Sequence, residues 1–222
     1  WYHSYREVDA LGGYDPYSAS KACAEHIISS YFRSFFMQNL LARKSPAVAV
    51  SSVRAGNVIG GGDWAQDRIV PDCIRSLEKK EPIPVRNKTA TRPWQHVLEP
   101  LGGYLLLASE IHKALYFKGE RNIERLEILC SPFNFGPNLS SNKTVLDLVK
   151  TILKYWPGEW QDKSDPNAPH EAGKLNLTID KAFHVLNWAP QWDFDHTVKE
   201  TVEWYCGALK EKSNSEFIQT LT

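Results

Sequence analysis

Apolar residues recur at steps of three and four positions over several long stretches of the chain, and this spacing predicts helices. The longest stretch covers residues 17–43, after Asp15-Pro16, which suits the start of a helix, and before Lys44-Ser45-Pro46, which suits its end. The same spacing predicts helices over 68–80, 98–116, 143–155, 179–187 and 195–209. Residues 210–222 are polar and are predicted to form a flexible tail.

Short runs of β-branched and apolar residues separate these helices. The run over 47–53 is typical of a strand that is buried on both faces. Further strands are predicted at 83–85, 94–97, 127–135 and 175–177, with irregular loops over 54–66 and 156–173. Because helices alternate with strands, the sequence predicts an α/β fold with a mostly parallel sheet.

Composition narrows the possible function classes. The 222 residues are 42% hydrophobic, which is enough for one large or two small domains. The balance of 26 basic and 26 acidic residues, without a basic block, argues against nucleic-acid binding. Apolar runs stay shorter than the roughly 20 residues that span a membrane. Because the chain opens at Trp1 in a polar and aromatic stretch, we expect it to be a piece of a longer protein.

The cysteines and histidines do not form metal-binding patterns. Cys23, Cys73, Cys130 and Cys206 lie far apart, without a C-x-x-C pair, and the histidines lack an H-x-x-x-H pair. We therefore expect free, mostly buried thiols in a reducing cytosol and no metal site.

Tyr17 and Lys21 are four residues apart at the start of the first predicted helix, so their side chains lie on one face. The ammonium group would favour the phenolate form of the tyrosine. Such a phenol can take a proton from a sugar or alcohol hydroxyl, or return one. The alternative is a chance pair on a solvated helix face, which is the commoner origin of this spacing.

A glycine-rich loop follows the predicted strand at 47–53. It contains Gly56 and Gly60-Gly61-Gly62. Ligands of open α/β sheets bind beyond the carboxyl ends of strands, and glycines let the backbone approach them closely. The loop lacks the G-x-G-x-x-G spacing, so it is not predicted to bind a dinucleotide pyrophosphate; a flexible surface loop is the alternative.

Two arginines are candidates for phosphate binding, because the guanidinium group can bind phosphate oxygens with two hydrogen bonds. They are Arg68 and Arg92, and Trp94 beside Arg92 is a candidate to stack on a base or sugar. A surface salt bridge is the alternative for each arginine. His96 and His170 are expected to be structural or rim residues rather than acid–base groups, and His170 is retained as a substrate-binding candidate.

Two further polar residues have a structural alternative. Lys174 is either a third cation for a diphosphate or a solvated lysine at a strand edge. Asn134, before Phe135-Gly136-Pro137, is expected to bond to the backbone within a turn.

Several motifs, taken in chain order, resemble one family. Tyr17-Ser18-Ala19-Ser20-Lys21 resembles the active-site signature of the short-chain dehydrogenase/reductases. Residues 54–58, 68–71, 92–97, 133–137 and 180–190 resemble the extended branch that acts on nucleotide sugars. Residues 12–17, 60–65 and 92–100 are most similar to the 4,6-dehydratases that act on CDP-glucose. The resemblance covers about residues 7–208.

The resemblance implies a domain arrangement. Residues 1–66 would form the carboxyl-terminal part of a Rossmann-like NAD-binding domain whose amino-terminal half is missing. Residues 67–209 would form mainly a smaller α/β domain for the nucleotide sugar, with segments near 98–135 returning to the Rossmann domain. The helices at 17–43 and 98–116 would pair in a four-helix homodimer interface.

The resemblance also implies residue roles. Tyr17 would deprotonate the C4 hydroxyl of CDP-glucose while NAD accepts a hydride, and Lys21 and Arg54 would contact NAD. The diphosphate would lie against Asn57 and Arg92, with help from Arg68. Trp94 and His170 complete the implied substrate contacts.

The family's glycine-rich NAD fingerprint and its Thr-Asp-Lys or Thr-Asp-Glu segment have no counterpart in these residues. The latter supplies the acid and base for the elimination, so we expect this chain alone to be inactive. An epimerase or decarboxylase of the same superfamily, and a non-catalytic binding module, are the alternative functions.

Overall fold

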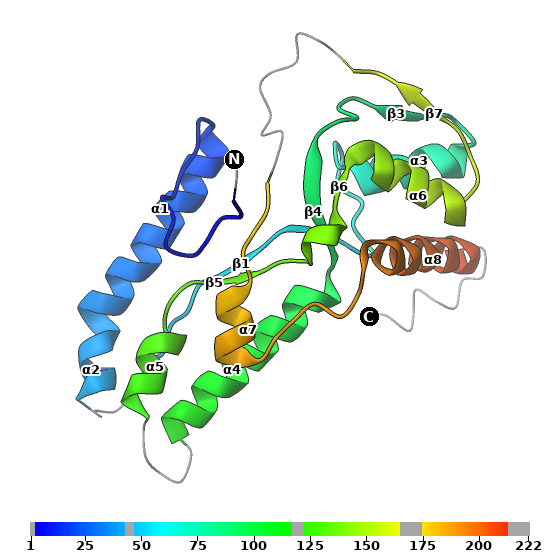
Figure 1. Cartoon of the computed structure of the whole chain (residues 1–222). Helices are drawn as coiled ribbons and strands as arrows, with labels where there is room; N and C mark the ends of the chain where they lie inside the picture. The colour runs from blue at the N-terminus through cyan, green and yellow to red at the C-terminus, as the bar shows by residue number, and fades with distance from the viewer. Residues whose placement is uncertain (1–2, 43–46, 117–121, 165–174, 213–222) are drawn as a thin grey trace.

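The computed structural model describes residues 3–42, 47–116, 122–164 and 175–212 (Figure 1). The α-helices are α1 (Pro16–Tyr31), α2 (Met37–Leu41), α3 (Ile69–Lys79), α4 (Leu98–Tyr116), α5 (Ile123–Leu129), α6 (Val145–Tyr155), α7 (Asp180–Leu186) and α8 (Phe194–Lys212). A π-helical segment, η1 (Phe32–Phe36), joins α1 to α2, and η3 (Leu139–Ser141) is a 3₁₀ turn. The strands are β1 (Val53–Ala55), β2 (Asn57–Ile59), β3 (Ile83–Val85), β4 (Thr91–His96), β5 (Phe133–Phe135), β6 (Asn142–Thr144) and β7 (Trp160–Asp162).

The strands form small sheets that are mostly parallel. Strand β1 pairs with β5 and β3 pairs with β7, both in parallel. Strand β4 lies between β2, which is parallel to it, and β6, which is antiparallel. An isolated parallel bridge joins Tyr5 to Leu177, and Thr178 N–H donates to the Tyr5 carbonyl at 2.8 Å. The predicted α/β class with parallel strands is confirmed.

Local sequence explains where the main helices begin and end. Asp15 caps α1 by accepting from the Ser18 N–H at 2.9 Å, and Pro16 occupies the first turn, where its missing N–H is not needed. Thr144 and Asp147 form a capping box at the start of α6. Helix α3 ends at Lys79, and the following residue, Lys80, is in the left-handed conformation. The long helices predicted from apolar spacing are therefore confirmed, with boundaries shifted by a few residues.

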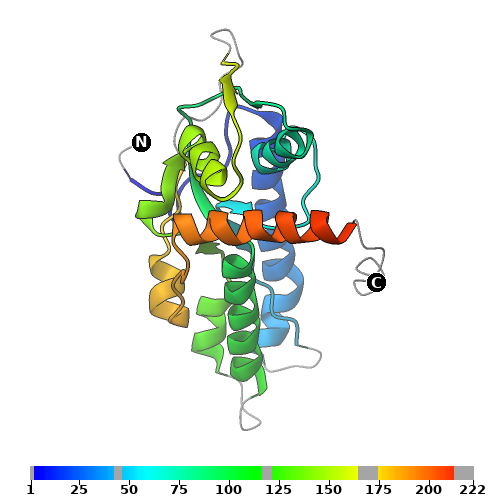
Figure 2. The ribbon, with the colours of Figure 1, turned by 90° about the vertical axis from the view of Figure 1, so that its right-hand side faces the viewer.

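Two apolar clusters hold these elements together. The first, called here the α8 cluster, joins α3, α6, α8 and the strands β2, β3 and β4. The second, called the α4 cluster, joins α4, α5, α7 and β5 to two residues of the first long helix, Phe32 and Leu40. In Figure 2, helix α8 crosses the front of the molecule below α3 and α6, and α4 extends downward from it.

Two residues of α4, Glu99 and Gly103, lie close to other parts of the chain. The Glu99 carboxylate, which is buried, accepts hydrogen bonds from the Gln191 and Trp192 N–H groups, both at 2.9 Å. Gly103 leaves room for the Phe135 ring, since a Cβ atom there would lie 2.3 Å from ring carbons. Helix α4 thereby contacts both the segment before α8 and strand β5.

Two strand predictions and two loop predictions were wrong in detail. Within 47–53 only Val53 belongs to a strand, because β1 has a single described partner, β5, and the pairing begins there. The predicted strand over 127–135 is helical as far as Leu129, because Asn122 caps α5 and Leu126 and Leu129, three residues apart, are buried together. The predicted loops contain β2, in 54–66, and β7, in 156–173.

Helix α8 extends to Lys212, beyond the predicted start of the tail at Lys210. Residues 213–222 lie outside the described residues.

Helices α1 and α4 do not share one surface. Helix α1 lies on one side of the β1–β5 pair, and α4 and α7 lie on the other (Figures 1 and 2). Each helix has exposed apolar side chains, among them Ile27 and Tyr31 on α1 and Leu101 and Leu105 on α4. The four-helix homodimer interface through these two helices stays a prediction.

Candidate active site

The predicted pair on α1 has the geometry that its spacing implies. The Lys21 Nζ atom lies 5.6 Å from the centroid of the Tyr17 ring, within the range of a cation–π contact. The Tyr17 side chain is 71% exposed, so its hydroxyl group is accessible from solvent. An accessible phenol beside an ammonium group can exchange a proton with a bound hydroxyl group.

One turn further along α1, Glu25 connects the helix to β1. Its carboxylate accepts hydrogen bonds from Arg54 Nε and from Ser52 Oγ, both at 2.8 Å. The Arg54 hydrogen bond holds the pKa of Glu25 below its ordinary value. Arg54 Nη1 also donates to the Glu7 carbonyl at 3.4 Å. In this structure Arg54 therefore fixes α1 to β1, and its predicted contact with NAD stays a prediction.

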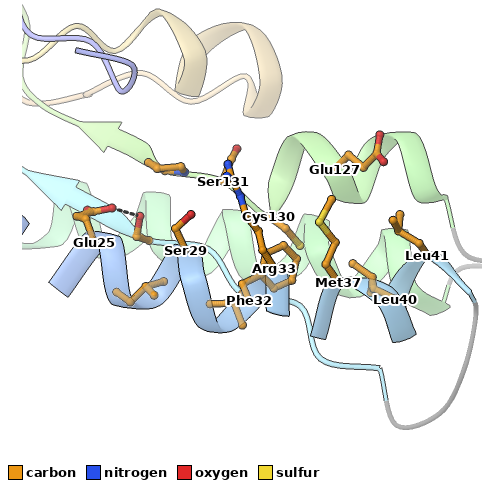
Figure 3. Close-up of a pocket in the computed structure, with 14 residues that line it drawn as sticks. Glu25, Ser29, Phe32, Arg33, Met37, Leu40, Leu41, Glu127, Cys130 and Ser131 are labelled. Carbon is orange, nitrogen blue, oxygen red and sulfur yellow. Dashed lines mark hydrogen bonds between the residues drawn. The ribbon is translucent and has the colours of Figure 1, made fainter. Parts of the chain in front are cut away.

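A hollow of about 200 Å³ lies along the next turns of the same helix (Figure 3). Its lining is mainly apolar, with Phe32, Met37 and Leu40 from the long helix and Cys130 and Pro132 from the chain before β5. Neither Tyr17 nor Lys21 lines it. The hollow is thus separate from the pair of Tyr17 and Lys21.

Asn57 lies in strand β2 and Asn134 lies in strand β5, near the edge of the sheet where the sequence predicts a ligand. Asn57 is half-buried at the start of β2, directly after Gly56. A Cβ atom at Gly56 would lie 2.9 Å from the Pro93 carbonyl oxygen, so glycine permits the close approach of β4. The Asn134 amide donates to the Tyr5 carbonyl at 3.1 Å, so it bonds to the backbone as expected, but from strand β5 to a distant segment and not within a turn.

The two predicted phosphate-binding arginines differ in exposure. The Arg68 side chain is 68% exposed at the start of α3 and lies 3.5 Å from the Asp63 carboxylate. Arg92 is buried on β4, and its Nη1 atom donates to the Thr91 carbonyl at 2.9 Å. Arg68 is thus placed to meet a ligand from solvent, whereas Arg92 is placed within the fold.

Trp94 is a core residue in this structure. It is buried in the α8 cluster, and its indole N–H donates to the Lys143 carbonyl at 3.0 Å. Its ring is therefore not available to stack on a base or sugar, and the predicted substrate contact of Trp94 is wrong for this arrangement. His170 and Lys174 lie outside the described residues.

His96 matches its expected structural role. It is buried at the end of β4, and its ring packs against Trp192 with centroids 4.6 Å apart. Burial lowers its pKa below the ordinary histidine value, so it is neutral at pH 7.

The sequence reasoning gave no role to two charged residues that join distant segments. The Glu7 carboxylate accepts the Asn134 N–H at 2.9 Å. Lys181 donates to Ser131 Oγ at 2.6 Å and to the Pro132 carbonyl at 2.8 Å, and it lies 4.2 Å from the Phe133 ring centroid. Burial lowers the pKa of Lys181. Lys181 is a charged residue within the apolar pattern of α7, and this was the one sequence signal that pointed to its contacts.

Within the part of the chain that the structure describes, His, Cys, Asp and Glu side chains do not gather in groups that suit a metal ion. All four cysteines are free. The helices of the described ranges are too short or too polar to cross a membrane.

Comparison with known proteins identifies the family. The family model described as GDP-mannose 4,6 dehydratase matches residues 2–201. The CDP-glucose 4,6-dehydratase of Salmonella typhimurium is 43% identical over 206 residues, which are 92% of this chain and 54% of that protein. The dTDP-glucose 4,6-dehydratase of Haemophilus influenzae is 23% identical, over 86% of this chain and 51% of that protein.

Solved structures support the same fold. A dTDP-glucose 4,6-dehydratase from Streptomyces venezuelae, solved with NAD bound, superposes on 92% of this chain with a TM-score of 0.70 at 20% identity, and the match covers 55% of that chain. A UDP-glucose 4-epimerase from Thermotoga maritima superposes on 92% with a TM-score of 0.69 at 18% identity, and the match covers 58% of that chain.

These matches agree in extent and in fold. The chain spans about half the length of the curated relatives it matches. The predicted resemblance to nucleotide-sugar dehydratases is confirmed, and so is the Rossmann-like α/β fold. With a family model matched over residues 2–201, this chain belongs to the GDP-mannose 4,6 dehydratase family.

Proposed function

We propose that this chain is part of an NAD-dependent dehydratase that converts CDP-glucose to CDP-4-keto-6-deoxyglucose and water. The observation that carries the proposal is the exposed Tyr17–Lys21 pair, which lies within the region that is 43% identical to a CDP-glucose 4,6-dehydratase. We infer the reaction class, a carbon–oxygen lyase, from the name of that relative.

The donor groups on α1 fit the ribose of NAD. The Tyr17 hydroxyl and the Lys21 ammonium groups lie on one exposed helix face, and both can bond to neighbouring ribose hydroxyls. When bound, NAD would supply reversible hydride acceptance, first from C4 of the sugar and later toward C6. Tyr17 would take the proton of the C4 hydroxyl group during oxidation, and Lys21 would stabilise the phenolate.

The resulting 4-keto group acidifies the C5 proton, which allows the C6 hydroxyl group to leave as water. We assign none of the residues described here to that elimination. Asn57, Arg68 and Arg92 are proposed to hold the diphosphate, since guanidinium groups bond to phosphate oxygens with charge assistance.

The domain division is part of the proposal. Residues 1–66 would belong with the NAD-binding part and residues 67–209 mainly with the nucleotide-sugar part. The α4 and α5 segments and β5 pack in the α4 cluster, which supports the return of residues 98–135 to the NAD-binding part. A homodimer and a cytosolic location stay predictions.

A second candidate is a nucleotide-sugar 4-epimerase, because a UDP-glucose 4-epimerase superposes with a TM-score of 0.69. The two candidates share oxidation at C4 and differ in the elimination step. An inactive fragment that binds a nucleotide sugar is the third.

The deciding experiment supplies CDP-, dTDP- and UDP-glucose to the full-length protein with NAD. We expect CDP-glucose to give the fastest formation of a 4-keto product, measured by its ultraviolet absorbance in alkali. Equal rates with all three nucleotide sugars would contradict the preference for CDP-glucose and leave only an enzyme of this superfamily. A C4-epimerised sugar without a 4-keto product would favour the epimerase, and absence of turnover would favour a binding module.

A further inference from the structure

The glycine loop between β2 and α3 is shaped around an aromatic side chain from α8. A Cβ atom at Gly61 would lie 2.0 Å from Cδ2 of Trp204, and one at Gly62 would lie 3.7 Å from the same ring. Gly62 also has a positive φ of 83°, a conformation that favours glycine. The indole ring therefore lies directly on the loop backbone, in space that any side chain at Gly61 would need.

The next residue of α8 bonds to the same loop. The Tyr205 hydroxyl donates to the Asp63 carbonyl at 2.6 Å, and the Trp64 ring meets the Tyr205 ring edge-on with centroids 5.1 Å apart. Tyr205 is fully buried, and burial raises its pKa to about 12, so it remains a hydrogen-bond donor at neutral pH. Val198 and Val202, on the preceding turns of α8, are fully buried in the α8 cluster. The loop is thus fixed relative to the core.

Arg75 of α3 bonds to the following carbonyl groups. It donates to the Trp64 carbonyl at 3.0 Å and to the Ala65 carbonyl at 3.1 Å. Together with Tyr205, it therefore binds three consecutive carbonyl groups, those of Asp63, Trp64 and Ala65. A glycine-rich segment loses more conformational freedom on ordering than other segments, so it needs contacts to hold it in one conformation. The hydrogen bonds from Tyr205 and Arg75 supply such contacts.

The loop leads directly to Arg68, which lies 3.5 Å from the Asp63 carboxylate. Trp204 and Tyr205 therefore determine the backbone position of the residue that pairs with Arg68. We propose that Trp204 and Tyr205 are positioning residues that hold the glycine loop so that Arg68 meets the substrate diphosphate. This inference rests on the proposed function, because it takes the diphosphate of a nucleotide sugar as the ligand of Arg68.

The test compares Tyr205→Phe with Tyr155→Phe in the full-length protein. Tyr155 is a matched control, because its hydroxyl also makes one hydrogen bond at α8, to Asp195, away from the loop. Binding through Arg68 is present in both the ground state and the transition state, so its loss raises KM and leaves kcat unchanged. We expect Tyr205→Phe to raise the KM for CDP-glucose about five- to tenfold, with kcat within about twofold. Tyr155→Phe should leave both constants unchanged.

A double-mutant cycle with Arg68→Ala shows whether the effect passes through Arg68. We expect Tyr205→Phe to raise KM by less than about twofold once Arg68 is alanine, because the residue it positions is gone. Trp204→Phe, which keeps a ring over Gly61, should raise KM less than Trp204→Ala. If Trp204→Ala does not fold, Tyr205→Phe and Trp204→Phe still test whether these residues position the loop.

Equal KM values for Tyr205→Phe and Tyr155→Phe would overturn the inference, and so would full additivity with Arg68→Ala. Both outcomes require that the unmodified protein turns over CDP-glucose. If the unmodified protein neither turns over CDP-glucose nor binds CDP, it is the proposed function that fails.

Discussion

Helices α8 and α1 are similar in length but are held in different ways. Three residues of α8, Val198, Val202 and Tyr205, are fully buried, and the helix packs into the α8 cluster. Helix α1 has no buried residue, and its side chain Ile27 is 58% exposed. Its Glu25 side chain accepts hydrogen bonds from Arg54 on β1 and from Ser52 just before that strand.

The two helices therefore differ in what they contribute: α8 contributes to stability, and α1 carries side chains proposed for chemistry. The packed helix contributes the positioning residues of a loop, whereas the exposed helix carries the pair proposed for proton transfer. Changes in the α8 cluster should therefore alter folding most, and changes on the exposed face of α1 should alter activity most.

The largest effect should come from Tyr17→Phe in the full-length protein. Loss of the acid–base hydroxyl should lower kcat by about 10²- to 10⁴-fold, with the fold and CDP binding retained because the side chain is exposed. Steady-state kinetics and circular dichroism check this. Tyr14→Phe is the control, because Tyr14 is also exposed and lies just before α1. Near-normal turnover by Tyr17→Phe would remove the assignment of this pair.

The contrast in packing is tested by Ile152→Ala and Ile27→Ala in the 222-residue chain. Ile152 of α6 is 1% exposed, so its truncation leaves a cavity and should cost about 2–5 kcal/mol in the free energy of unfolding. Ile27→Ala should change it by less than about 0.5 kcal/mol. Urea unfolding measures both. A loss above about 1.5 kcal/mol for Ile27→Ala would show that another copy or segment covers α1.

A smaller effect is expected where α4 meets β5. Gly103→Ala would place a methyl group 2.3 Å from Phe135 ring atoms, and this overpacking should cost about 1–3 kcal/mol of unfolding free energy. The adjacent Gly102→Ala is a close control, since a Cβ atom there has no neighbour within 4 Å. Gly102→Ala should be neutral or should stabilise the helix by up to about 1 kcal/mol. Equal effects of the two substitutions on thermal unfolding would contradict the observed packing.

The smallest effect concerns the polar attachment of α1. Glu25→Gln removes the ionic hydrogen bond to Arg54 and should lower the free energy of unfolding by about 1–2 kcal/mol at pH 7. The native pKa of Glu25 is lowered from its ordinary value of 4.5. Its stabilising contribution is therefore present above pH 4.5 and is lost as pH falls through the native pKa.

The two proteins should accordingly become equally stable toward low pH, which a series of unfolding curves from pH 7 to pH 3 can measure. Glu203→Gln is the control, because its pair with Lys199 is exposed and should contribute less than about 0.5 kcal/mol. A difference for Glu25→Gln that stays constant with pH would show that the effect is not ionic.

Sequence reasoning succeeded where local spacing determines the structure. The steps of three and four apolar residues identified the long helices, and the four-residue spacing placed Lys21 over Tyr17. It failed where a contact comes from far along the chain. Trp94 beside Arg92 resembled a ligand contact, but its indole group bonds to a carbonyl 49 residues later. The α5 segment was misassigned because short apolar runs suit a helix or a strand equally well.

The bridge between Tyr5 and Leu177 has a consequence for the order of folding during synthesis. These residues are 172 positions apart, as the neighbouring Ser4 and Asn176 are. A ribosome adds about 5–20 residues per second, so the segment before α1 waits on the order of ten to thirty seconds for its partner. The segment that leads into α1 is therefore fixed late, after most of the chain has emerged. In a nascent chain stalled before Leu177, the segment that leads into α1, with Tyr17 and Lys21, would lack its pairing partner.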